Sequence, residues 1–196
     1  MMLDKLLKNQ EIKSKIKQFS SDGLIYDIVV YGSIVKGKEK INDLDIAIII
    51  NKNKSLNTKL KLAQEFRKLF SFLEIELDVK IIAFNDFMDK SFLARQAIIS
   101  EGYSLLKNGY LSEQLGYKTY VFFDYNLTSL TNSQKKTFYY VLNGRRKDIG
   151  LLKKKGAIKI SNNLIKIPIV NFYEFKELFK LHNISNSYWV SMEYLF

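Results

Sequence analysis

The segment from Tyr31 to Ile50, YGSIVKGKEKINDLDIAIII, constrains the fold more than any other part of the chain. A strand-like apolar run ends at Gly32-Ser33, and a second apolar run begins with Asp43 and Asp45. Alternate residues of a strand share a face, so the two carboxylates point together while Leu44 points into a core. Like charges on a partly buried sheet edge are costly unless a cation lies between them, and a divalent metal is the usual cation. The segment therefore predicts a Mg²⁺ site beside a glycine turn suited to phosphate.

The composition indicates a folded protein of 196 residues with 47% hydrophobic residues, ample for a core. The sequence contains no cysteine, which excludes disulfides and thiolate metal sites and suits a reducing compartment. No apolar run approaches the roughly 20 residues that span a bilayer, and the charged N-terminal residues lack the apolar core of a signal peptide. We therefore expect a soluble, cytoplasmic protein.

Residues 1–110 mix helical and strand-like patterns, which predicts an α+β fold with helices packed on a small mixed sheet. Apolar residues at helical spacing predict helices over residues 1–19, 56–72 and 91–100, the last ending at Glu101-Gly102. Apolar runs predict strands at 24–31, 43–50 and 74–83. In the third strand, period-2 alternation places Glu76, Asp78 and Lys80 on one face.

Residues 111–196 predict a second, basic domain, with 13 Lys and Arg against 6 Asp and Glu. Such a surplus attracts polyanions or an acidic protein surface, although solvated lysine faces would explain it equally well. The expected elements are a strand at 117–125, helices at 131–142, 146–155 and 171–182, and a hairpin around Asn162-Asn163. The order helix, turn, basic helix, hairpin predicts a small α+β, winged-helix-like domain that binds an acceptor or partner.

The glycine turn and the paired aspartates resemble the nucleotidyltransferase superfamily (DNA polymerase beta-like), whose signature is an apolar strand, Gly-Ser, a short spacer and Asp-apolar-Asp. Gly32-Ser33 and Asp43-Leu44-Asp45 match that signature, and Asp78 best matches the third carboxylate on a later strand. The run LARQAIISEGYSLL is similar to the tail of the minimal nucleotidyltransferase branch, so the likeness covers residues 24–106.

The resemblance implies a role for each matched residue. Asp43, Asp45 and Asp78 would bind two Mg²⁺ ions and carry the catalysis, with Asp78 also helping to take the acceptor proton. The turn at Gly32 and Ser33 would hold the triphosphate of an NTP, which we expect to be ATP. Lys36, where many minimal members have arginine, would neutralise the pyrophosphate leaving group.

Several alternatives remain open on the sequence alone. Glu76 shares the face of Asp78 and could be the third ligand instead, while Lys38 and Lys80 could also contact phosphate. Arg95 is either part of the family tail or an ordinary surface residue of a helix. The only histidine, His182, has no partner pattern and is expected to be structural. Trp189 and its aromatic neighbours are expected to form a core or an interface rather than a platform on which bases stack.

The resemblance favours an enzyme that transfers a nucleoside monophosphate from NTP to a hydroxyl acceptor. The minimal branch points to a protein acceptor in a toxin–antitoxin system, whereas small molecules and RNA ends are further acceptors known in the superfamily. An alternative from another class is a nucleic-acid-binding regulator whose nucleotidyltransferase fold is inactive or only senses nucleotide. No base preference or oligomeric state follows from the sequence.

Overall fold

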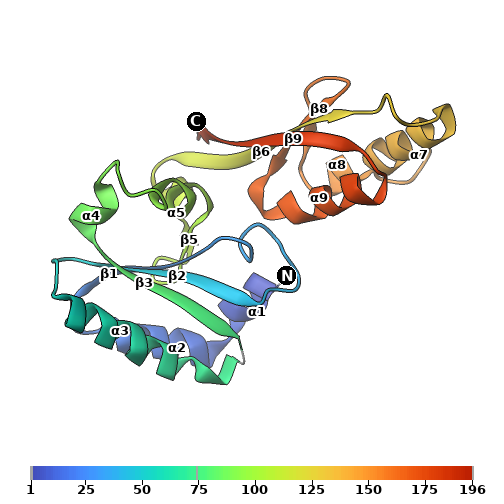
Figure 1. The fold of residues 1–196 in the computed structure, drawn as a ribbon. Coiled ribbons are helices and arrows are strands. Elements are labelled where there is room, and N and C mark those ends of the chain that lie inside the picture. Colours follow the sequence, from blue (N-terminus) through green and yellow to red (C-terminus); the bar gives the residue numbers. More distant parts are fainter. Residues whose placement is uncertain (1, 74, 196) are drawn as a thin grey trace. The chain divides into compact units, whose positions relative to one another are not determined.

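The computed structural model describes residues 2–73 and 75–195 and divides into two units (Figure 1). The first unit ends at Gly116 and the second begins at Tyr117. Glu74, which the sequence placed at the start of a strand, lies outside the described residues. Within the described residues, no helix is long and apolar enough to cross a membrane.

The first unit is built on a mixed sheet covered by helices, which confirms the predicted α+β fold. Side by side, its strands are β3 (Glu76–Ala83), β2 (Asp43–Ile50), β1 (Ile25–Tyr31), β4 (Tyr103–Ser104) and β5 (Gly109–Tyr110). Strands β2 and β3 run parallel, and the other neighbours run antiparallel. The three long strands coincide closely with the predicted ones, because β1 and β2 carry long apolar runs and β3 alternates polar and apolar residues.

Helices cover both faces of this sheet. They are α1 (Met2–Lys8), α2 (Gln10–Phe19), α3 (Leu56–Leu69), α4 (Phe84–Met88), α5 (Arg95–Glu101) and α6 (Leu111–Gln114), with a 3-10 turn at Ser71–Leu73. The single helix predicted over residues 1–19 is two helices. Asn9 caps the second, since its side-chain oxygen accepts hydrogen bonds from the N–H groups of Glu11 and Ile12.

The sheet separates two apolar cores. The larger core contains Ile28, Ile46 and Val79 of the strands together with Ile16 and Phe66 of α2 and α3. The smaller core contains alternate strand residues, among them Val29, Ala47 and Ile82, packed against Phe87 of α4 and Ile98 of α5. By strand alternation, Asp43, Asp45 and Asp78 share the face of the smaller core.

A buried carboxylate fastens β4 to β1. Asp27 is fully buried, and Ser104 of β4 donates a 2.6 Å hydrogen bond to its Oδ1. Lys107 Nζ lies 3.5 Å from the other oxygen. Burial raises the pKa of Asp27, while Ser104 and Lys107 oppose that rise.

Ser104→Ala should therefore lower the free energy of unfolding by about 1–3 kcal/mol, because it removes a partner from a buried carboxyl group. Chemical denaturation measures the loss, and Ser133→Ala at an exposed site is the matched control. A loss no larger than that of the control would show that Asp27 does not depend on this hydrogen bond.

The second unit is α+β, but its topology is not that of a winged helix. Its strands, side by side, are β7 (Ile158–Lys159), β8 (Leu164–Pro168), β6 (Tyr117–Asn126) and β9 (Ser185–Tyr194), and all neighbours are antiparallel. The helices are α7 (Asn132–Asn143), α8 (Leu151–Lys154) and α9 (Phe172–Leu181), with a 3-10 turn at Ile169–Asn171. The order β6, α7, β7, β8, α9, β9 is the ferredoxin-like βαββαβ arrangement, with α8 as an addition.

The predicted hairpin around Asn162-Asn163 is present, and the long strand β9 was not predicted. The basic helix predicted over 146–155 is only the four-residue α8, and its Leu152 is buried. Proteins that read duplex DNA through a helix-turn-helix place a longer recognition helix in the major groove. The second unit therefore lacks, in its described residues, the element on which the DNA-regulator interpretation depended.

Candidate active site

The glycine turn follows directly from the end of β1. Gly32 has φ +78°, a left-handed conformation that glycine adopts without strain, and Gly37 has φ +87°. The backbone N–H of Lys36 donates to the carbonyl of Gly32, and buried Val35 anchors the turn in the larger core. The predicted phosphate turn is thus a compact segment with a fixed position at the strand end.

The register of the sheet brings the carboxylates together. Asp45 lies opposite Tyr31 of β1 on one side and opposite Asp78 of β3 on the other. Asp43 lies opposite Glu76. Directly paired residues share a face, so the structure places all four carboxylates on the same side of β2 and β3.

Gly32 approaches Asp45 so closely that a β-carbon at Gly32 would overlap the Asp45 carboxylate. The absence of a side chain at this position therefore lets the acidic motif and the phosphate turn meet. Glycine is thus favoured at position 32 for two reasons, the close approach of the Asp45 carboxylate and the left-handed backbone conformation.

Asp45 is in an environment that disfavours its negative charge. Burial raises its pKa, and the charges of Asp43 and Asp78 raise it further, while Lys80 and Lys36 act in the opposite direction. A bound cation would relieve this repulsion. The electrostatics of Asp45 thus fit a metal ion coordinated by carboxylate oxygens.

Lys80 at present supplies a positive charge beside Asp78. Its ammonium lies 3.2 Å from Asp78 Oδ2 and donates a hydrogen bond of 3.3 Å to the Tyr31 hydroxyl. Burial alone would lower the pKa of Lys80, but the bonds to Tyr31 and Asp78 outweigh it and raise the pKa. Among residues 2–73 and 75–195, no three His, Cys, Asp or Glu residues are already gathered as a metal site. A Mg²⁺ ion bound through Oδ2 of Asp78 would compete with Lys80 for that oxygen.

Glu101 is a site residue that the sequence did not reveal. It lies at the end of α5, and both of its oxygens meet the ammonium of Lys36, at 3.2 and 3.1 Å. Burial raises the pKa of Glu101, and the charge of Asp45 adds to the rise. The ion pair fixes the Lys36 ammonium beside the acidic motif. Its only sequence signal was a helix stop at Glu101-Gly102.

Two other candidates are structural. Arg95 donates a 2.8 Å hydrogen bond to the backbone carbonyl of Met88, which links α5 to the end of α4. His182 packs edge-on against Phe138 in the core of the second unit, with ring centroids 5.4 Å apart. Neither lies in the row of carboxylates.

Asp45→Asn should raise the free energy of unfolding near neutral pH when Mg²⁺ is absent, because it removes a repelled, partly buried charge. The folded-state pKa of Asp45 is raised, so the stability that Asp45 contributes is fully present below its unfolded pKa and is lost as pH rises through the folded pKa. The advantage of the variant should therefore shrink below about pH 4.

Mg²⁺ should stabilise the wild type more than the Asp45→Asn variant. Thermal denaturation at both pH values checks this, with Glu113→Gln at an exposed position as control.

Comparison with known proteins identifies one family. A family model described as "Polymerase beta, Nucleotidyltransferase" matches residues 10–109. No curated protein matches the chain.

Three solved structures illustrate the similarity found. A toxin–antitoxin complex with AMP-PNP is 24% identical with a TM-score of 0.36, covering 47% of this chain and 71% of that chain. The toxin–antitoxin MntA-HepT is 22% identical with a TM-score of 0.33, covering 50% and 71%. A tri-AMPylated Shewanella oneidensis HEPN toxin in complex with MNT antitoxin is 24% identical with a TM-score of 0.32, covering 47% and 67%. At these scores no structural detail is transferred from them.

Proposed function

The chain belongs to the polymerase beta nucleotidyltransferase family, and from this premise we propose that it transfers a nucleoside monophosphate, AMP from ATP, to a hydroxyl acceptor in a Mg²⁺-dependent reaction. The observation that carries the proposal is the junction of Gly32 with Asp45. There, the glycine turn, which is suited to phosphate, lies against the carboxylate of Asp45, and Asp45 is paired with Asp78 on the next strand. This arrangement would put a triphosphate and its metal ions in one place.

The reaction proposed is an in-line displacement at the α-phosphorus. The acceptor oxygen forms a bond to that phosphorus, the bond from the phosphorus to the oxygen bridging to the β-phosphate breaks, and pyrophosphate leaves. The acceptor hydroxyl loses its proton to Asp78. Two bound Mg²⁺ ions would supply charge stabilisation at the entering and leaving oxygens.

Each residue of the chain has a task in that displacement. Asp43, Asp45 and Asp78 offer the oxygen ligands for the ions. The backbone at Gly32 and the Ser33 hydroxyl bind the triphosphate. Lys36, which Glu101 already orients, neutralises the leaving pyrophosphate.

We propose a protein as the acceptor, within a toxin–antitoxin pair. Support comes from the tail segment LARQAIISEGYSLL, which resembles the minimal branch and forms α5 and β4 in the structure. Solved toxin–antitoxin complexes also recur among the proteins to which the chain is similar. The second unit would then contribute to the choice of partner.

Incubation with ATP and Mg²⁺ tests this function. Label placed on the α-phosphate should move to a co-purified protein while label on the γ-phosphate is released with pyrophosphate. Mass spectrometry of co-purified proteins and RNA identifies the acceptor. If ATP binds but its α-label reaches no protein, RNA or small molecule, the chain is not a transferase under these conditions and the proposal is wrong.

A further inference from the structure

The sheet of the second unit carries aromatic side chains on both of its faces. On one face, Val121, Phe123 and Ile165 form a core with α7, α8 and α9. The opposite face, here called the outer face, contains the alternate residues. Across it, Lys166, Phe122 and Trp189 lie side by side on β8, β6 and β9, and Tyr120 with Ser191 forms the next row. Alternation normally places polar residues on a solvated face, so aromatic residues there indicate a function.

The rings of the outer face are arranged as a stacking surface. Phe122 and Trp189 lie parallel, with centroids 5.2 Å apart and an interplanar angle of 4°. Trp189 is 48% exposed, and β9 lies at the end of the strand order, so the indole can accept a further flat ring. Base–aromatic stacking of this kind tolerates any base sequence.

Cations border the rings. Lys166 Nζ lies 4.5 Å from the centre of the Tyr120 ring, and Lys118 Nζ lies 5.8 Å from the same ring. Lys166 also forms a 2.7 Å ion pair with Glu193. From residue 117 to the end, the sequence holds 13 Lys and Arg against 5 Asp and Glu. A polyanion is therefore attracted to this unit as a whole. On the outer face itself, Lys118 and Lys166 are balanced by Asp124 and Glu193, so the lysines act there as local cations beside the rings.

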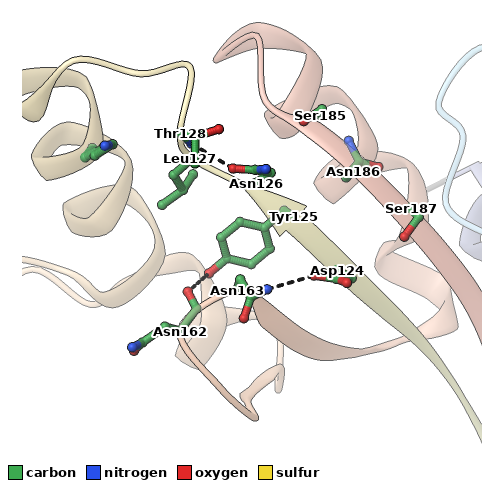
Figure 2. A pocket seen from close by; sticks show the side chains of 11 residues that line it. Asp124, Tyr125, Asn126, Leu127, Thr128, Asn162, Asn163, Ser185, Asn186 and Ser187 are labelled. Atoms are coloured by element: carbon green, nitrogen blue, oxygen red, sulfur yellow. Dashed lines mark hydrogen bonds between the residues drawn. The ribbon is translucent and has the colours of Figure 1, made fainter.

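A polar hollow of about 680 Å³ adjoins the same face (Figure 2). Asp124 and Ser187 follow Phe122 and Trp189 as the next row of the sheet, and both line the hollow. Figure 2 shows Asn163 donating a 3.0 Å hydrogen bond to Asp124 and the Tyr125 hydroxyl donating one of 3.0 Å to the carbonyl of Asn162. Besides these bonded groups, Ser185 and Ser187 line the hollow, and their hydroxyls suit the hydrogen-bonding edges of unpaired bases.

We propose that the outer face of this sheet binds single-stranded RNA. Exposed rings can stack on bases that are free of a duplex, and the positive charge of the unit as a whole attracts a phosphate backbone. A sheet with exposed aromatic residues on the strands is also a known way to hold unpaired RNA bases. The binding is a property of the second unit and does not depend on the proposed transfer reaction.

Trp189 provides its own probe, because it is the only tryptophan in the sequence. Titration of the full chain with short oligouridylate, without ATP or Mg²⁺, should quench its emission. Affinity should fall steeply as salt rises, with a slope of about −0.7 for each phosphate neutralised. Trp189→Val and Tyr120→Val retain strand propensity, and each should weaken the binding of labelled RNA by about tenfold. Thermal denaturation confirms that the variants fold.

Arg145→Ala with Arg146→Ala is the matched control. These exposed residues follow α7 and lie outside the sheet, so their loss should weaken RNA binding by no more than about threefold through general charge. If the double arginine variant lost RNA binding while Trp189→Val retained it, the binding site would lie in the loop after α7 and the proposal would be refuted. Equal affinity for duplex RNA or for single-stranded DNA would refute the assigned ligand. If RNA did not quench the emission, and sedimentation showed self-association that depends on Trp189, the outer face would be a protein interface instead.

Discussion

Asp78→Asn is expected to reduce nucleotidyl transfer by about a thousandfold, whereas Glu76→Gln should leave the rate within about threefold of the wild type. Both side chains point from the same face of β3, so period-2 alternation could not distinguish them. The register does, because Asp78 lies opposite Asp45 and Glu76 lies opposite Asp43. Asp45 is the carboxylate next to the glycine turn, so we propose the residue paired with it as the third ligand of a bound metal ion.

The two variants form a matched pair, since each removes one negative charge from the same strand. Initial rates of label transfer at saturating ATP and Mg²⁺ give the comparison, and denaturation shows whether each variant is folded. Asp78→Asn also frees Lys80 from its 3.2 Å ion pair, so its Mg²⁺ requirement should be measured as well. A rate lowered by Glu76→Gln and not by Asp78→Asn would assign the third ligand to Glu76.

The local part of the site could be predicted from the sequence. Strands β1, β2 and β3 each carry enough apolar residues to be recognised, and the Gly-Ser and Asp-x-Asp positions are fixed relative to those strands. The sequence could not predict which distant residues would contact the site residues after folding. Glu101 is 65 residues away from Lys36, and Ser104 is 77 residues away from Asp27. Such pairs depend on where α5 and β4 pack, which no local pattern encodes.

The second unit shows a different limit. From α7 to β8 the order of elements is the same as in a winged helix, so that segment alone suggested the wrong topology. The deciding feature is the pairing of β6 with both β8 and β9. Strand β9 was not predicted because Tyr188 and Trp189 are adjacent aromatic residues that face opposite sides, which hides the alternation. Of the two, only Trp189 lies on the outer face, where it pairs with Phe122 and contributes to the exposed aromatic surface.

Gly32→Ala should lower transfer by about a hundredfold or more and reduce the free energy of unfolding by about 2–3 kcal/mol. Two costs add up in this variant. Alanine at φ +78° is strained by roughly 1 kcal/mol, and its β-carbon would displace the Asp45 carboxylate. Gly23→Ala isolates the first cost, because Gly23 has φ +71° and nothing within 4 Å of an added β-carbon.

A double-mutant cycle separates the second cost. In an Asp45→Ala background the overlapping oxygen is gone, so Gly32→Ala should then destabilise no more than Gly23→Ala does. Chemical denaturation of the four proteins of the cycle gives the coupling free energy. Strictly additive effects would mean that Gly32 is required only for its backbone conformation. A coupling of 1 kcal/mol or more, on the order expected for residues in contact, would show that glycine is needed so that the phosphate turn and the acidic motif can touch.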